Sequence, residues 1–149
     1  MSDRLYTIGY EGMDLPALLD YLRATGVECV LDIRENPFSR KPGFSKEPLS
    51  QALEARGIRY VPLRELGTPR PLRDKVKADG DYETFFQAMR QHLATRREAI
   101  EQACDHIRRM TCCLMCYEQS ADACHRKVVA EMIRERIGDR LETRHLRAD

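Results

Sequence analysis

The chain has 149 residues, with 25 Lys and Arg against 24 Asp and Glu, and 42% of its residues are hydrophobic. This length and composition fit one folded domain spanning residues 1–149 and argue against intrinsic disorder. The formal net charge of +1 excludes binding driven by a polybasic tail or a uniformly basic surface.

The charge is unevenly distributed along the chain. Residues 1–33 carry two basic and six acidic side chains, whereas residues 34–77 carry eleven and five, a net charge of +6. Twenty of the basic residues are Arg and five are Lys. Because the Arg guanidinium matches carboxylates and phosphates, this bias favours a local anion site, although a GC-rich genome explains it equally well.

The six cysteines suit a reducing compartment. No secretory leader opens the sequence, and no apolar run approaches the roughly 18 residues of a membrane span. Cys112, Cys113 and Cys116 crowd into one segment, which is poor spacing for disulfides between distant loops. We therefore expect a cytoplasmic protein with no membrane partner.

Short apolar runs alternate with helical stripes along the chain. The strands are expected at residues 5–8, 27–33, 58–63, 111–117 and 141–146. Helices are expected from Asp14 to Gly26, between residue 47 and Gly57, from Asp81 onward with a break at the capping-box pattern 95–98, and from Ala123 to Gly138. Two long loops remain, residues 34–47 and 64–80.

This alternation predicts an α/β fold: a three-layer, Rossmann-like domain with a mostly parallel sheet of about five strands and helices on both faces. In such sheets ligands bind in the crevice beyond the carboxyl ends of the strands. We expect the two long loops to form the walls of that crevice.

Several spaced motifs follow the expected strands. They are Thr7-Ile8-Gly9-Tyr10, Asp32-Ile33-Arg34 with Pro37, Ser39 and Arg40, Leu66-Gly67, Cys116-Tyr117-Glu118, and Cys124-His125-Arg126. Together they resemble the bacterial domain-of-unknown-function 488 family, which includes YeaO-like proteins. The resemblance covers nearly the whole chain and implies a compact cytosolic α/β domain, but it implies no reaction.

The strongest chemical signal is the run Cys124-His125-Arg126. Ser120 or Asp122 can cap a helix there, which would place all three side chains in its first turn. The helix N-terminus, Arg126 and a protonated His125 would then favour a thiolate at Cys124, either as a nucleophile or as part of an anion pocket. The alternative is a buried core cysteine, because Cys124 shares a helical stripe with Val128 and Met132.

A zinc site is a rival interpretation. Cys113, Cys116, Cys124 and His125 supply four soft ligands within a short stretch. However, residues three apart on a strand point to opposite faces, so Cys113 and Cys116 cannot chelate one ion without a turn between them. We therefore expect no metal, with Cys112 and Cys113 as core residues.

Polar residues at the other strand ends complete the candidate site. Glu118 is expected as a general base or as an orienting partner for His125 or Arg34, and alternatively as a solvated loop carboxylate. Asp32 must pair with a donor at the end of its buried strand. The expected substrate contacts are Tyr10, Asp32, Arg34, Ser39, Arg40, Cys116 and Arg126, with Phe38 or Phe44 offering a stacking face.

Our first hypothesis is an enzyme that acts on a phosphorylated small molecule, a nucleotide or a nucleic-acid group, with Cys124, His125 and Glu118 performing the chemistry. The alternatives are a non-catalytic nucleic-acid-binding module using the Arg-rich loops 34–47 and 64–77, and a zinc-stabilised interaction domain. No cofactor is expected, because no GxGxxG follows the first strand and no Walker-type sequence occurs.

Overall fold

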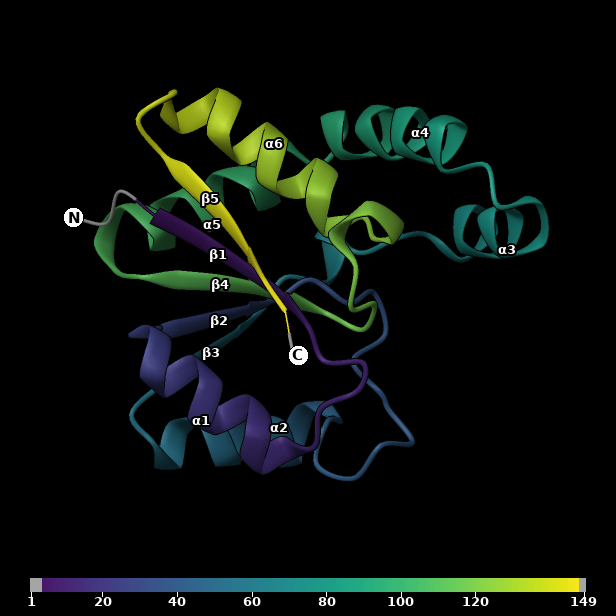
Figure 1. The fold of residues 1–149 in the computed structure, drawn as a ribbon. Coiled ribbons are helices and arrows are strands. Elements are labelled where there is room, and N and C mark those ends of the chain that lie inside the picture. Colours follow the sequence, from purple (N-terminus) through teal and green to yellow (C-terminus); the bar gives the residue numbers. More distant parts are fainter. Residues whose placement is uncertain (1–3, 148–149) are drawn as a thin grey trace.

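The computed structural model describes residues 4–147 and places one parallel sheet of five strands between two layers of helices (Figure 1). The strands are β1 (Arg4–Gly9), β2 (Cys29–Asp32), β3 (Arg59–Pro62), β4 (Cys112–Cys116) and β5 (Glu142–Leu146). The helices are α1 (Leu15–Thr25), α2 (Lys46–Ala55), α3 (Arg70–Asp79), α4 (Tyr82–Ala94), α5 (Arg97–Arg109) and α6 (Arg126–Ile137). Two short 3-10 turns are η1 (Arg64–Leu66) and η2 (Ala121–Ala123). The expected three-layer α/β fold is confirmed.

The strand order is β3-β2-β4-β1-β5, so β4 is inserted between the first two strands of the chain. The helices α1 and α2 lie on one side of the sheet, and α5 and α6 lie on the other (Figure 1). Connections leaving β1 and β2 therefore pass to one side, whereas the connection leaving the intervening β4 passes to the opposite side. This divergence opens a crevice at the carboxyl ends of the strands, where ligands bind in open parallel sheets.

Each face of the sheet has its own hydrophobic core, because neighbouring residues on a strand point to opposite faces. Along β4, Cys112, Leu114 and Cys116 pack with α5 and α6, whereas Cys113 and Met115 pack with α1 and α2. All five residues are buried. A strand with no polar position fits a central place in a parallel sheet covered on both sides.

Local signals explain where several helices begin and end. The Asp14 side chain accepts a hydrogen bond from the backbone N–H of Ala17, which caps α1, and Gly26 ends that helix with φ +85°. Gly138 ends α6 as expected. The predicted break near residue 95 separates α4 from α5, although Thr95 ends α4 rather than capping α5. Within residues 4–147, no helix is both long and apolar enough to cross a membrane.

The expectation of a loop over residues 64–80 is wrong. Most of this segment forms η1 and α3. Pro71 does not prevent the helix because it lies in the first turn, where its missing N–H has no helical acceptor. The sequence pattern for a helix was weak in this segment, since only Leu72 and Val76 of α3 pack against the core.

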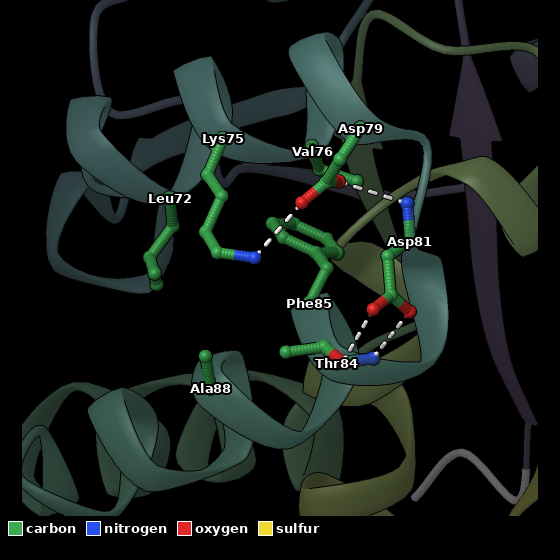
Figure 2. A pocket seen from close by; sticks show the side chains of 8 residues that line it. All are labelled: Leu72, Lys75, Val76, Asp79, Asp81, Thr84, Phe85 and Ala88. Atoms are coloured by element: carbon green, nitrogen blue, oxygen red, sulfur yellow. Dashed lines mark hydrogen bonds and ion pairs between the residues drawn. The ribbon is translucent and has the colours of Figure 1, made fainter.

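The corner between α3 and α4 is fixed by side-chain hydrogen bonds around a small pocket (Figure 2). Lys75 Nζ donates to Asp79 Oδ2 at 2.8 Å, and the backbone N–H of Asp81 donates to Asp79 Oδ1 at 2.9 Å. Asp81 in turn accepts from the backbone and hydroxyl of Thr84, which caps α4. These bonds hold α3 in a defined position relative to α4.

Candidate active site

A cavity of about 840 Å³ lies at the carboxyl edge of the sheet, among the β2–α2 loop, α3, α4 and the segment that joins β4 to α6. Eight of the ten expected site residues line it: Tyr10, Arg34, Ser39, Arg40, Cys116, Glu118, Cys124 and His125. Asp32 and Arg126 lie outside the lining, but each is buried and bonded to a residue that belongs to it. The strand register brings these segments together, since Gly9 pairs with Cys116 and Asp32 with Met115.

Asp32 and Arg34 form a buried ion pair at the end of β2. Arg34 Nε and Nη2 donate to the two carboxylate oxygens of Asp32 at 2.9 and 2.7 Å, and Tyr60 donates its hydroxyl to the same carboxylate at 2.6 Å. Burial opposes the charge on Arg34, but the bonds and charge of Asp32 outweigh it and raise the pKa of the guanidinium. Such an arrangement fixes geometry rather than offering a free cation.

Arg34 also holds the wall of the cavity. Its Nη1 donates to the carbonyl oxygen of Phe44 at 2.6 Å and to the Tyr10 hydroxyl at 3.3 Å. The Tyr10 ring stacks on Phe44 with centroids 4.4 Å apart, and Lys41 donates to the Tyr10 carbonyl oxygen. The expected phosphate clamp by Arg34 is therefore not favoured, because four of its donor contacts are already made inside the protein.

Cys124 and His125 precede α6 instead of lying in its first turn, which corrects the sequence expectation. Ser120 caps only the short turn η2, Cys124 has extended backbone angles, and His125 occupies the N-cap position of α6. The backbone N–H of Arg126 still points toward Cys124 Sγ at 3.5 Å. The Cys124 sulfur thus lies at the N-terminus of α6.

The imidazole of His125 is oriented by the backbone. Its Nε2 lies 2.8 Å from the carbonyl oxygen of Ile33, and because a carbonyl only accepts, Nε2 carries a proton. The other nitrogen, Nδ1, lies 3.6 Å from Cys124 Sγ. Nδ1 is therefore free to accept a proton from the thiol, and the contact to Ile33 keeps the ring in place.

Arg126 is completely buried behind the two cysteines. Its guanidinium donates to Thr7 Oγ1, Cys116 Sγ and the carbonyl oxygens of Glu118 and Gln119. Among residues 4–147, no carboxylate bonds to this guanidinium. Burial works against its charge, yet the Cys116 and Cys124 thiols raise its pKa. A buried cation without a carboxylate favours a thiolate nearby.

Of the two neighbouring thiols, Cys116 is the weaker candidate for that thiolate. It is buried, and burial together with the adjacent Cys124 thiol raises the pKa of Cys116 well above its usual value. Cys124 receives the helix N–H and faces His125 as well as the cavity. Of the two sulfurs, Cys124 is therefore the better candidate for a nucleophile.

Cys116, Cys124 and His125 also make a possible ligand set for a metal ion. One ligand atom from each residue lies within 4.8 Å of the other two. The four-ligand set that the sequence suggested is not formed, because Cys113 points into the core on the α1–α2 face of the sheet. Three protein ligands with an open position fit a catalytic rather than a structural zinc site.

Two cations of the cavity were not named as individual site residues, although they lie in the basic segment 64–77 that was expected to form a wall of the crevice. Arg73 and Lys77 lie four apart on α3 and line the cavity with Arg40 of the β2–α2 loop. Arg73 lies 3.5 Å from Glu35, whereas Glu118 has no hydrogen bond or ion pair to its carboxylate within residues 4–147. Arg73 and Lys77 were not named individually because α3 was expected to be irregular; the four-residue spacing of these basic side chains was the available signal.

The sequence profile of a family described as "Domain of unknown function DUF488" matches residues 14–133, which is most of the chain. No curated protein and no solved structure shows a significant match. The fold and the arrangement of the site are therefore the basis for any functional conclusion.

Proposed function

The chain belongs to the DUF488 family, whose description assigns no activity, and from its site we propose an enzyme in which Cys124 attacks a phosphorylated substrate. The observation that supports this most directly is the contact between Cys124 Sγ and His125 Nδ1, with Nε2 held by the Ile33 carbonyl. Both side chains line the same cavity. A nucleophile, a base and a group that orients the base are the minimal parts of a thiol enzyme.

The proposed reaction begins with proton transfer from the Cys124 thiol to His125 Nδ1. The sulfur then bonds to an electrophilic carbon or phosphorus atom of the substrate, and the leaving group departs with the proton from His125. Water completes the cycle by displacing the thiolate, and His125 or the unpaired carboxylate of Glu118 accepts its proton. Arg126 balances the thiolate charge from within the protein.

Alkylation of the folded protein tests the nucleophile. We expect iodoacetamide to modify Cys124 first, because the other cysteines except Cys116 are buried away from the cavity. His125→Gln should slow this reaction by about tenfold or more, since glutamine can keep the bond to Ile33 but removes the base at Nδ1. Cys104→Ala is the matched control. Burial raises the pKa of Cys104 to about 11, so the loss of this thiol should leave the alkylation rate of Cys124 unchanged.

Two outcomes would contradict the proposal. One is a Cys124 alkylation rate in the folded protein no faster than that of Cys104. The other is turnover of a phosphorylated substrate, once found by screening phosphomonoesters and nucleotides, that survives Cys124→Ser undiminished.

A second candidate is a metal-dependent enzyme, favoured by the proximity of Cys116, Cys124 and His125. The bond from His125 Nε2 to a carbonyl is the outer-shell contact that ligating histidines normally make. Metal analysis of protein purified without chelators separates the two candidates. One equivalent of zinc that is lost in Cys116→Ala would replace the nucleophile proposal with metal-assisted hydrolysis.

A further inference from the structure

Building on the proposed phosphorylated substrate, we infer that the cavity binds a nucleotide unit, with its base on the aromatic rim and its phosphate on the cationic wall. The aromatic rim consists of Phe38 and Tyr117, and the cationic wall consists of Arg40, Arg73 and Lys77. This combination of stacking faces and cations is the chemistry by which proteins hold unpaired nucleotides.

The aromatic rim is the first observation. Among residues 4–147, the large hydrophobic side chains that remain exposed are Phe38, at 66%, and Tyr117, at 48%. Both line the same cavity, although they come from loops far apart in the sequence. Single exposed apolar residues are ordinary on protein surfaces, but two aromatic rings at one cavity mouth indicate a ligand with an apolar face.

Contacts within the protein hold the Tyr117 ring and the backbone beside Phe38. The Tyr117 ring meets Tyr10 edge-on at 5.4 Å, and the Tyr117 carbonyl accepts a hydrogen bond from Glu11. Beside Phe38, the Ser45 hydroxyl accepts from the backbone N–H of Ser39 and donates to its carbonyl. Stacking on Tyr117 would therefore require little further ordering of that side chain.

The cationic wall is the second observation. It comes from the β2–α2 loop and α3, whereas Glu118 follows β4 on the other wall. Arg40 and Lys77 have no hydrogen bond or ion pair to their side chains in the part of the chain that the structure describes. Both are therefore available to an anion, and Arg73 needs only to leave its 3.5 Å contact with Glu35.

The size of the cavity agrees with a ligand larger than a phosphate alone. Sites for cofactor-sized ligands span about 300–1,000 Å³, and this cavity has about 840 Å³. A phosphorylated sugar without a base would leave the aromatic rim exposed. A nucleotide uses the rim and the cations together.

Calorimetric titration of Cys124→Ser protein tests the inference without requiring catalysis. The probes are the four common nucleoside monophosphates, the corresponding nucleosides, ribose 5-phosphate and a short single-stranded oligonucleotide. At least one nucleotide should bind at least about tenfold more tightly than ribose 5-phosphate and than its own nucleoside. Tyr117→Leu and Phe38→Leu should each weaken nucleotide binding by roughly 5- to 100-fold, the usual effect of losing one stacked base.

Matched variants distinguish the loss of a stacking ring or a phosphate contact from a general effect of mutation on nucleotide affinity. Tyr21→Leu removes an aromatic ring outside the cavity lining, and Arg140→Gln removes an exposed cation outside it; both should leave nucleotide affinity unchanged. Arg40→Gln should weaken nucleotides and ribose 5-phosphate alike, because it acts on the phosphate. An oligonucleotide that binds much more tightly than a mononucleotide, with a steep salt dependence, would identify a single strand as the source of the nucleotide unit.

Equal affinity for ribose 5-phosphate and every nucleotide would overturn the inference, as would normal nucleotide binding by Tyr117→Leu and Phe38→Leu. A failure of the nucleophile proposal would leave these binding results unaffected, since the titrated protein lacks the Cys124 thiol.

Discussion

The backbone at Gly9 lies directly against the carbonyl group of Glu118, so that a Cβ atom on residue 9 would overlap the Glu118 carbonyl oxygen. The same carbonyl accepts a hydrogen bond from Arg126. Gly9 therefore allows the end of β1 to approach the segment that carries the candidate site.

Gly9→Ala should consequently destabilise the protein by about 3 kcal/mol or more, because the added methyl group meets backbone rather than a flexible side chain. Gly57→Ala is the control: its φ is +75°, but nothing lies within 4 Å of the added Cβ. That variant should cost only about 1–2 kcal/mol for its left-handed backbone. Urea unfolding measures both, and equal losses would contradict the steric argument.

The parts of the fold that the sequence predicted are those with strong local signals. Asp14 and Gly26 bracket α1, and the uninterrupted apolar run of β4 marks a central strand. The segment of α3 was missed because its apolar stripe consists of two residues and a proline stands in its first turn. Its stability comes from tertiary contacts that a local pattern does not contain.

The candidate site was partly predictable for a related reason. Parallel strands end at one edge of the sheet, so the residues that follow them were expected to converge, and Tyr10, Arg34, Glu118 and Cys124 do so. Which cations are free could not be predicted. The commitment of Arg34 to Asp32 and of Arg126 to backbone carbonyls depends on contacts between distant segments.

Breaking the buried ion pair of Asp32 and Arg34 should be strongly destabilising. Asp32→Asn leaves a buried guanidinium without its counter-charge, and we expect a loss of about 3–5 kcal/mol. Tyr60→Phe removes one hydrogen bond to the same carboxylate and should cost about 1 kcal/mol. Urea unfolding at pH 7 compares the two variants. A loss in Asp32→Asn no greater than in Tyr60→Phe would show that the ion pair is not the main anchor.

We expect that lysine cannot replace Arg126. Lysine keeps the charge but cannot reach the four acceptors that the guanidinium contacts at once, so Arg126→Lys should lose about 3 kcal/mol. Arg134→Lys on the same helix is the control, because Arg134 is exposed and makes one bond to Asp139. Its unfolding free energy should change by less than about 0.5 kcal/mol. Similar losses in both variants would contradict a special role for the buried guanidinium.

His106 should make the protein sensitive to mild acid. Burial lowers the pKa of His106, the nearby Arg59 and Arg109 lower it further, and only Asp105 opposes them. Its Nδ1 atom is buried and has no hydrogen-bond partner within the described residues. The unfolded chain, with a histidine pKa of about 6.5, therefore binds a proton at a higher pH than the folded one does.

The stabilising effect of a neutral His106 is thus present above about pH 6.5 and is lost as the pH falls toward the lowered folded-state pKa. His106→Gln should reduce the decrease in unfolding free energy between pH 7 and pH 5, measured by urea unfolding at half-unit steps. It should not remove that decrease, because burial also lowers the pKa values of His92 and His145. An unchanged decrease in the variant would mean that His106 gains its proton equally easily in the folded and unfolded chains.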